Sequence, residues 1–141
     1  MNRNNTDLKR FLDAQQRDYA IALAEMKAGR KRSHWMWYIF PQVAGLGYSE
    51  IAHHYAIKNR DEAIAYFDHP VLGKRLVEIS SVLLDLREHN ASRVMGSPDD
   101  MKLRSSMTLF SLVPDTDPVF EAVLKKFFDG KKDPATLQLL T

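Results

Sequence analysis

Proline placement constrains the fold of this chain more than any other sequence feature. Four of the six prolines directly follow a residue that is suited to cap a helix, in the pairs His69-Pro70, Ser97-Pro98, Asp117-Pro118 and Asp133-Pro134. Proline is favoured at the first position of a helix, where its missing N–H is not needed. Each pair therefore predicts a helix start, and the carboxylates of Asp99 and Asp100 add favourable charge to the start after Ser97.

Apolar residues recur at three- and four-residue spacing, as they do on one face of a helix. This periodicity predicts helices over residues 8–26, 72–86, 98–112 and 120–127, and a shorter helix from Ser49 to about Ile57. Asn59, with an acidic residue three positions later, adds a helix start of the capping-box type. Alternating strand patterns are almost absent, and residues 35–40 (WMWYIF) fit either a buried strand or a short helical turn.

These signals predict an all-α fold, a compact array of six to eight helices. The 141 residues are the length of one domain, so we expect a single helical domain over residues 1–141, with residues 1–6 disordered. The balance of 45% hydrophobic and 27% charged residues is that of a globular protein. It excludes a disordered chain and a collagenous one.

Cysteine content and charge exclude several further classes of protein. The chain contains no cysteine, which excludes a disulfide scaffold, a zinc ribbon, an iron–sulfur cluster and a thiol nucleophile. The net charge is +2, although residues 1–34 alone carry +4. The N-terminal residues contain no apolar run suited to a signal peptide, and no segment is apolar for long enough to cross a bilayer. We therefore expect a cytoplasmic protein with no membrane partner.

Residues 29–42 form the densest unusual segment, with both tryptophans, three consecutive cations and a histidine. One interpretation is the wall of a binding pocket, in which aromatic faces stack a base or sugar and cations hold a phosphate or carboxylate. His34 titrates near neutral pH and would act there as a general acid or base. The alternative is structural, with tryptophans in the core, cations in a solvated loop and a histidine that caps the next turn.

Residues 97–110 form a second polar segment, which also has two interpretations. On the functional interpretation, part of the segment faces a cleft opposite residues 30–42, through Asp100, Lys102, Ser105 or Thr108. On the structural interpretation, helix capping accounts for Ser97, Asp99 and Asp100. Small hydroxyl side chains within a helix also mark close packing, so the two interpretations stay open for the rest of the segment.

The sequence predicts neither a metal site nor a cofactor. Gly45-x-Gly47 lacks the preceding strand and the third glycine of a dinucleotide-binding motif. Glu50 and His53 form one half of a di-iron carboxylate signature, but the sequence has no second copy with that spacing. His53 and His54 are consecutive, so they point to different faces of a helix and cannot hold one ion together.

Four runs of the sequence are distinctive as motifs: RKRSHWMWYIFPQVAGLGYSEIAHHYAI, AIAYFDHPVLGKRL, GSPDDMKLRSSMTLF and KKFFDGKKDPATLQLL. In this order they resemble the bacterial domain-of-unknown-function family 1810, and the similarity extends from residue 8 to the last helix. The resemblance implies a small, all-helical, cytosolic protein without an established activity. Members of this family are often labelled calpastatin, but calpastatin-type inhibitors are disordered chains that fold on their protease. We therefore expect no calpain inhibition from this chain.

The resemblance also implies which positions carry the pattern of the family. Those that match are Lys31, His34, Trp35, Met36, Trp37, Phe40, Pro41, Gln42, Gly45, Gly47, Tyr55, His69, Pro70, Gly73, Asp100, Lys102, Met107, Thr108 and Phe110. Many relatives have a cysteine where this chain has Ser106, which argues against thiol chemistry at that position. The polar residues in the pattern exceed what a core requires, and this favours a shared cleft.

We predict a cleft between residues 31–42 and 100–108 that binds, and in one version turns over, a small anionic metabolite or nucleotide derivative. The predicted ligand-binding residues are Lys31, His34, Trp35, Trp37, Gln42, His69, Lys102 and Thr108. His34 and Asp100 are the candidates for proton transfer, and the sequence leaves open whether the protein is an enzyme. The alternative is a non-catalytic protein-interaction module. Nucleic-acid binding, which rests on residues 30–32, ranks last.

Overall fold

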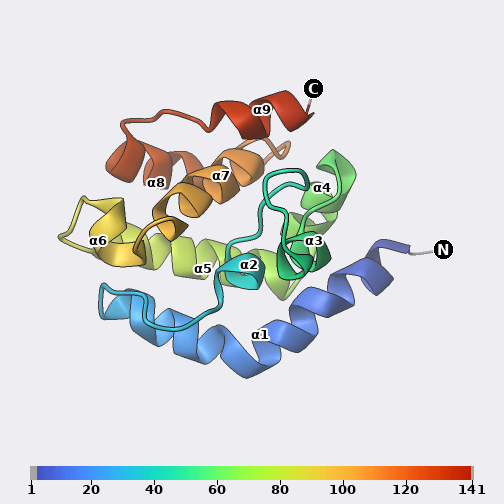
Figure 1. Cartoon of the computed structure of the whole chain (residues 1–141), viewed down its shortest axis with the longest axis horizontal. Coiled ribbons are helices and arrows are strands. Elements are labelled where there is room, and N and C mark those ends of the chain that lie inside the picture. The colour runs from blue at the N-terminus through green and yellow to red at the C-terminus, as the bar shows by residue number, and fades with distance from the viewer. Residues whose placement is uncertain (1–2, 141) are drawn as a thin grey trace.

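The structure, a computed structural model, describes the backbone of residues 3–140 and the side chains of residues 8–140. It confirms the predicted all-α class (Figure 1). The helices of this range are α1 (Arg3–Lys27), α2 (Met36–Ile39), α3 (Glu50–Tyr55), α4 (Arg60–Asp68), α5 (Leu72–Asp85), α6 (Ala91–Met95), α7 (Asp99–Ser111), α8 (Val119–Phe128) and α9 (Pro134–Leu140). Six of these helices have seven residues or more, and α2, α3 and α6 are shorter.

The first helix begins near the start of the chain. Helix α1 begins at Arg3, so residues 3–6 of the segment expected to be disordered are helical, and residues 1–2 lie outside the described residues. Within residues 3–140 there is no strand, and Val43 and Ile57 form an isolated bridge. No helix in that range combines the length and the apolar character needed to cross a membrane.

Helix α5 lies at the centre of the molecule (Figure 1). It packs against α1 on one side and α8 on the other, and α7 packs against α6, α8 and α9. The apolar stripe of α5 is at most 1% exposed and consists of Leu72, Leu76, Ile79 and Leu83. Burial of each such side chain contributes about 1.5–3 kcal/mol, so this stripe is a large part of what holds the other helices in place.

The prolines mark helix starts, but only α9 has its proline at the first helical position. Helices α5, α7 and α8 each begin one or two residues after the proline. At α5, Nδ1 of His69 accepts hydrogen bonds from the N–H groups of Val71 and Leu72. At α5 the capping side chain thus bonds the N–H groups beyond the proline, which has no N–H of its own, and the helix begins later than the pair predicts.

Residues 35–40 form a helical turn, α2, and not a strand. The turn is held from α1 by Gln15, whose Nε2 donates hydrogen bonds to the carbonyl of Tyr38 and the hydroxyl of Tyr66. Gln15 itself is only 2% exposed. A strand in this position would leave its backbone groups buried without a neighbouring strand to bond, whereas a helical turn satisfies them internally.

Helices α4 and α5 approach each other closely at Gly73. A Cβ atom on Gly73 would stand 1.9 Å from the backbone oxygen of Phe67, which no side chain can tolerate. The carbonyl of His69 accepts a hydrogen bond from the N–H of Gly73, so the corner between the two helices is tight. The glycine in the run HPVLG is therefore required by the packing of two helices.

We expect Gly73→Ala to lower the free energy of unfolding by about 3 kcal/mol, because the added methyl group forces the α4–α5 corner apart. Gly130→Ala is the control, since Gly130 has open space around its Cβ position and only a positive φ of 76°. It should cost about 1 kcal/mol. Urea denaturation followed by circular dichroism measures both, and equal losses in the two variants would contradict the close approach.

Ser106 lies in the buried part of α7 and is 0% exposed. Its Oγ has no hydrogen-bond partner among the described residues. A buried hydroxyl without a partner costs about 1–3 kcal/mol, whereas a buried thiol behaves as a small hydrophobic group. The position at which relatives are expected to carry cysteine is therefore a packing position in this chain, closed to solvent and to any substrate.

We expect Ser106→Cys to raise the free energy of unfolding by about 1 kcal/mol, because it replaces the unpaired hydroxyl with a weakly polar thiol of the same shape and slightly larger size. The neighbouring Ser105→Ala is the matched control. The Oγ of Ser105 donates a hydrogen bond to Asp133 at 2.8 Å, so its loss should destabilise by about 1 kcal/mol. Urea denaturation under reducing conditions measures the unfolding free energy of both variants. Changes of the same sign in the two variants would refute the assignment of Ser106 as a buried hydroxyl without a partner.

Candidate functional site

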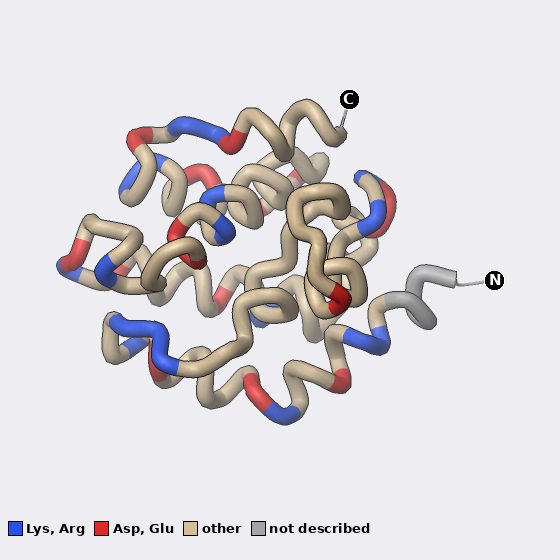
Figure 2. The backbone as a smooth tube through the Cα atoms, in the orientation of Figure 1, with Lys and Arg blue, Asp and Glu red and all other residues tan. Residues whose placement is uncertain are grey.

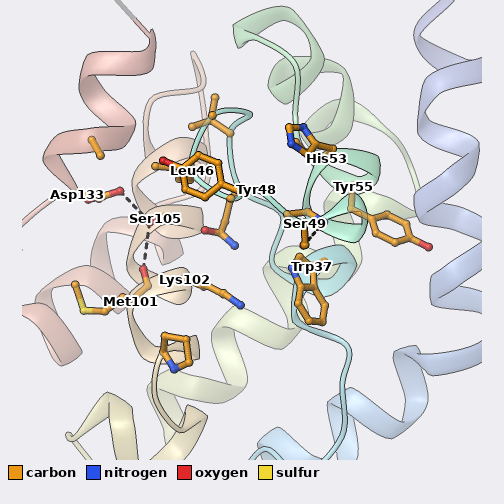
Figure 3. Close-up of a pocket in the computed structure, with 18 residues that line it drawn as sticks. Trp37, Leu46, Tyr48, Ser49, His53, Tyr55, Met101, Lys102, Ser105 and Asp133 are labelled. Atoms are coloured by element: carbon orange, nitrogen blue, oxygen red, sulfur yellow. Dashed lines mark hydrogen bonds between the residues drawn. The ribbon is translucent and has the colours of Figure 1, made fainter.

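A pocket of about 490 Å³ lies between α7 and the segment that runs from residue 42 into α3 (Figure 3). Trp37 and Gln42 line it from the first of the two segments singled out in the sequence, and Lys102 and Ser105 line it from the second. Asp133, just before α9, contributes from a third part of the chain. Ligand pockets in proteins have volumes of about 300–1,000 Å³, so this one can hold a small molecule.

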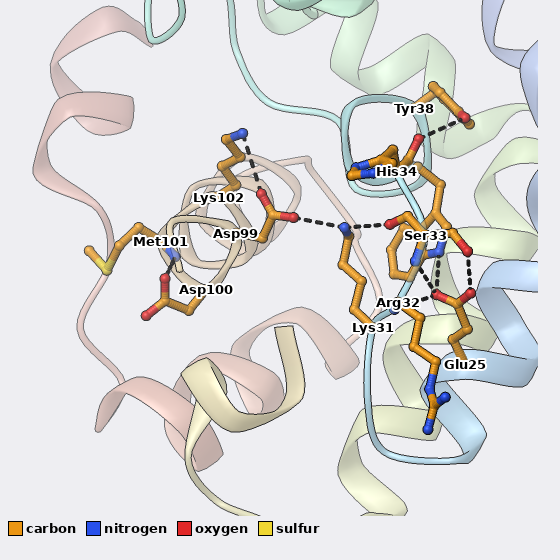
Figure 4. Close-up of polar contacts among 11 residues, drawn as sticks. Glu25, Lys31, Arg32, Ser33, His34, Tyr38, Asp99, Asp100, Met101 and Lys102 are labelled. Carbon is orange, nitrogen blue, oxygen red and sulfur yellow. Dashed lines mark hydrogen bonds and ion pairs between the residues drawn. The ribbon is translucent and has the colours of Figure 1, made fainter. Parts of the chain in front are cut away.

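Lys102 is the residue that gives the pocket a positive charge. Its Nζ lies 4.7 Å from the centre of the Trp37 ring and 3.3 Å from Oδ1 of Asp99. The other oxygen of Asp99 lies 2.9 Å from Nζ of Lys31 (Figure 4). One carboxylate therefore serves two ammonium groups, and the three side chains together carry a net charge of about +1 beside the pocket.

Lys31 does not line the pocket, but it stabilises the loop next to it. Its side chain is only 8% exposed, and its Nζ donates a hydrogen bond to the carbonyl of Ser33 at 2.6 Å. The same group lies 5.1 Å from the centre of the Trp35 ring. With the carboxylate of Asp99 as its ion-pair partner, Lys31 links the loop after α1 to the start of α7.

Glu25 of α1 shapes the loop that leads to the pocket. Its carboxylate accepts hydrogen bonds from the N–H groups of Arg32 and Ser33, the hydroxyl of Ser33 and Nε1 of Trp35 (Figure 4). Trp35 is 1% exposed and belongs to the core. Burial raises the pKa of the Glu25 carboxyl, but the four hydrogen bonds outweigh burial and bring that pKa to about 2.

The wall formed by α3 is held in place by Arg10 of α1. The Arg10 guanidinium donates hydrogen bonds to the carbonyls of His54 and Ala56 at 2.7 and 2.8 Å. It also forms an ion pair of 2.9 Å with Glu62, whose side chain is 3% exposed. Glu62 in turn accepts the N–H of Lys58. The chain from α3 to α4 is therefore fixed to α1, and the pocket wall is fixed with it.

His34 and Asp100, the candidates for proton transfer, are not among the residues that line this pocket. His34 is exposed, and its backbone carbonyl accepts a hydrogen bond from the hydroxyl of Tyr38. Asp100 accepts the N–H of Met101. Figure 4 shows the two side chains on opposite sides of the Lys31–Asp99–Lys102 group. We assign neither residue a role in the pocket.

Thr108 and His69 also lie away from the pocket. Thr108 is 0% exposed, donates a hydrogen bond to the carbonyl of Arg104 and accepts the N–H of Asp133, so it joins α7 to the loop before α9. His69 caps α5 and lines a different hollow of about 440 Å³. Of the eight predicted ligand-binding residues, the pocket therefore contains Trp37, Gln42 and Lys102, and it does not contain Lys31, His34, Trp35, His69 or Thr108.

The cations of residues 30–32 lie at the end of the molecule where α1 ends and α6 begins (Figure 2). The backbone N–H of Lys31 donates a hydrogen bond to the carbonyl of Val94 in α6, which fixes the loop there. Arg30 and Arg32 are exposed and do not line the pocket. The run of three cations is therefore divided, with one side chain committed to an ion pair and two in solvent.

The structure adds pocket residues that the sequence did not single out as ligand-binding, among them Tyr48, His53 and Asp133. Asp133 accepts hydrogen bonds from the hydroxyls of Ser105 and Thr136. Burial raises the pKa of Asp133, but these bonds outweigh it and the pKa lies below its ordinary value. The sequence predicts Asp133 as a helix cap, and the structure confirms that role. No local sequence pattern indicates that Asp133 lies in the same pocket as residues about 90 positions earlier in the chain.

Several polar side chains of the pocket are free to bond a ligand, Gln42 and His53 among them. Among the described residues, none forms a hydrogen bond with the side-chain amide of Gln42 or the imidazole of His53. Within residues 8–140, no group of three or more histidine, aspartate or glutamate side chains is placed to hold a metal ion. The chemistry that the pocket offers is thus one cation, an amide, an imidazole and aromatic faces.

Comparison with known proteins shows that the chain is similar to proteins of unknown function. The model of a family described as "Protein of unknown function (DUF1810)" matches residues 5–140. The crystal structure of the conserved hypothetical protein Rv1873 from Mycobacterium tuberculosis is similar over 95% of this chain and 96% of that one. The two are 45% identical in sequence and superpose with a TM-score of 0.93. None of the curated proteins matches the sequence.

We expect Glu25→Gln to destabilise the protein by about 1–2 kcal/mol at neutral pH, because charge-assisted hydrogen bonds to the loop are lost. The pKa of Glu25 is lowered in the folded state, so its contribution is present above about pH 4.5 and lost as the pH falls through about 2. The difference in unfolding free energy between wild type and variant should therefore shrink on acidification. Urea denaturation at several pH values measures it.

The control for this comparison is Glu121→Gln. The side chain of Glu121 is 64% exposed and lies 3.7 Å from Lys132, so its removal should change the unfolding free energy by less than about 1 kcal/mol at any pH. A wild-type advantage over Glu25→Gln that stays constant down to pH 2 would show that the Glu25 charge does not hold the loop.

Proposed function

The chain belongs to the DUF1810 family of proteins of unknown function, and we propose that it binds a small anionic metabolite, such as a nucleotide derivative, in the pocket between α7 and residues 42–49. The observation that carries this proposal is the position of the Lys102 ammonium. It is held over Trp37 by Asp99 and faces a pocket of the size of a small molecule. Oriented cations in such pockets select carboxylates and phosphates.

Electrostatics supports an anion over a neutral ligand. Lys102 is the only lysine or arginine among the described residues that line the pocket, and the negative charge beside it is shared with Lys31. The carboxylate of Asp133 is the one acidic group of the lining, and it is occupied by hydroxyl groups of the protein. The two ammonium groups balance the carboxylates of Asp99 and Asp133, so an anionic group is attracted at the Lys102 end of the pocket, where the ammonium faces the lining.

The rest of the pocket supports an organic ligand over a bare anion. The Trp37 ring offers a flat apolar face next to the cation, and the Gln42 amide offers one acceptor and two donor hydrogens. Gln42 is held at its backbone, where its carbonyl accepts the N–H of Ile57. An amide beside an aromatic face is suited to a ring or sugar with polar substituents.

The alternative is a protein-interaction module, which one observation favours. Three of the exposed large hydrophobic residues border the pocket: Tyr48 and Met101 line it, and Leu139 contacts the lining residue Gly45. Met101 is 49% exposed and Leu139 is 47% exposed. An apolar rim of this kind also fits the side chains of a bound peptide.

The test is a thermal-shift screen with a panel of carboxylates, sugar phosphates and nucleotides. A ligand at 100 times its Kd should raise Tm by roughly 5–10 °C. Lys102→Met should weaken the affinity for that ligand by about 10–100-fold, because a charge-assisted contact is lost while the side-chain stem remains. Lys125→Met is the control, since Lys125 is an exposed cation of α8 outside the pocket.

The results separate the proposal from its alternative. An anionic ligand whose shift survives in Lys125→Met and is lost in Lys102→Met supports the pocket. Equal shifts in both variants would place the anion elsewhere on the surface and refute the proposal. If no member of the panel shifts Tm, the small-ligand function is wrong and the interaction module becomes the leading hypothesis.

A further inference from the structure

Tyr48 is the most exposed large hydrophobic residue among those described, at 91%. Its ring borders the pocket but forms no hydrogen bond and no ring contact with any described residue. Aromatic side chains bury 150–250 Å² when they pack, so a fully solvated tyrosine at the rim of a cavity leaves a large apolar surface unused. This surface is available to whatever enters the pocket.

The backbone beneath Tyr48 is fixed on both sides. Gly47 lies so close to α3 that a Cβ atom there would stand 2.7 Å from the Cβ of Ala52. Gly45 has a φ of +106° and packs under Leu139 of α9, 3.0 Å from where its Cβ would be. Ser49 then caps α3. The glycines of the GLGY run thus allow the loop to lie close against α3 and α9, while the side chain of Tyr48 stays exposed.

Trp37 and Tyr48 face the same space from different parts of the chain. Figure 3 shows Tyr48 on the loop side of the pocket and Trp37 on the side of α2, with Lys102 reaching from α7 toward Trp37. Trp37 is already covered on one face by the Lys102 ammonium, at 4.7 Å. A flat group bound beside that ammonium lies in the pocket that both Trp37 and Tyr48 line.

We propose that Tyr48 is a ligand-contacting residue, which turns onto a planar ring of the ligand, and that the pocket selects anions that carry such a ring over anions that do not. This inference rests on the proposed function and adds the chemical class of the ligand. Stacking against an aromatic side chain suits any flat ring, because every such ring has a π-face. The anionic group lies at Lys102 and the ring lies under Tyr48.

The experiment compares matched pairs of probes by isothermal titration: adenosine 5′-monophosphate with ribose 5-phosphate, and benzoate with cyclohexanecarboxylate. We expect the member with a planar aromatic ring, adenosine 5′-monophosphate or benzoate, to bind roughly tenfold more tightly than its partner in at least one pair. Tyr48→Ala should remove that advantage, and Tyr48→Phe should keep it within about twofold. Tyr48→Ala without ligand should melt within about 1 °C of the wild-type Tm, because Tyr48 is 91% exposed and its ring packs against little of the protein.

Ile21→Ala is the matched control, since Ile21 is 48% exposed on α1 and does not line the pocket. Its affinities should equal those of wild type. If both members of each pair bind equally, or if Tyr48→Ala keeps the preference for the ring, the inference is overturned while the proposed function stands. If none of the four probes binds and the thermal-shift panel gives no shift, the proposed function fails and the inference fails with it.

Discussion

The carboxylate of Asp99 is the point at which the two sides of the pocket are joined. It accepts Lys31 from the loop after α1 and Lys102 from its own helix, at 2.9 and 3.3 Å. Because Lys31 is nearly buried and Lys102 is not, the two cations have different structural roles. Lys31 ties the loop to α7, and Lys102 is left with its charge against Trp37 and the pocket. One negative charge thus positions two positive charges, and the excess lies where a ligand enters.

Helix α1 supports this arrangement through three polar side chains on its inner face. Arg10 holds the segment between α3 and α4, Gln15 holds α2, and Glu25 holds the loop that precedes it. Each bonds backbone groups that a loop cannot satisfy by itself. Because a long helix is stiff, the loops that are hydrogen-bonded to α1 are held in a fixed position around the pocket. The side chain of Tyr48 is the exception, since its ring lines the pocket and is 91% exposed.

Much of the fold follows from local patterns in the sequence. The stripe from Leu72 to Leu83 predicts α5 because helical periodicity depends only on neighbours along the chain. The structure differs from the sequence-based prediction where the local conformation depends on contacts that the local sequence pattern does not contain. The helix after Pro70 begins later than the pair suggests, because His69 bonds the N–H groups beyond the proline. Residues 35–40 contain a helical turn, and the carbonyl of Tyr38 in that turn accepts a hydrogen bond from Gln15, which is 23 residues earlier in the chain.

The sequence by itself determined the helical class, the two segments rich in polar and aromatic residues, and the absence of thiol chemistry. Only the tertiary structure decided which residues of those segments face one another. Trp35 and Trp37 are two positions apart, yet one is buried against Glu25 and the other faces the pocket. Helix direction and the Asp99 ion pairs place Lys102 in the pocket and turn Asp100 away. Burial and contacts between distant residues are properties of the packed chain, so the spacing of residues along the sequence does not determine them.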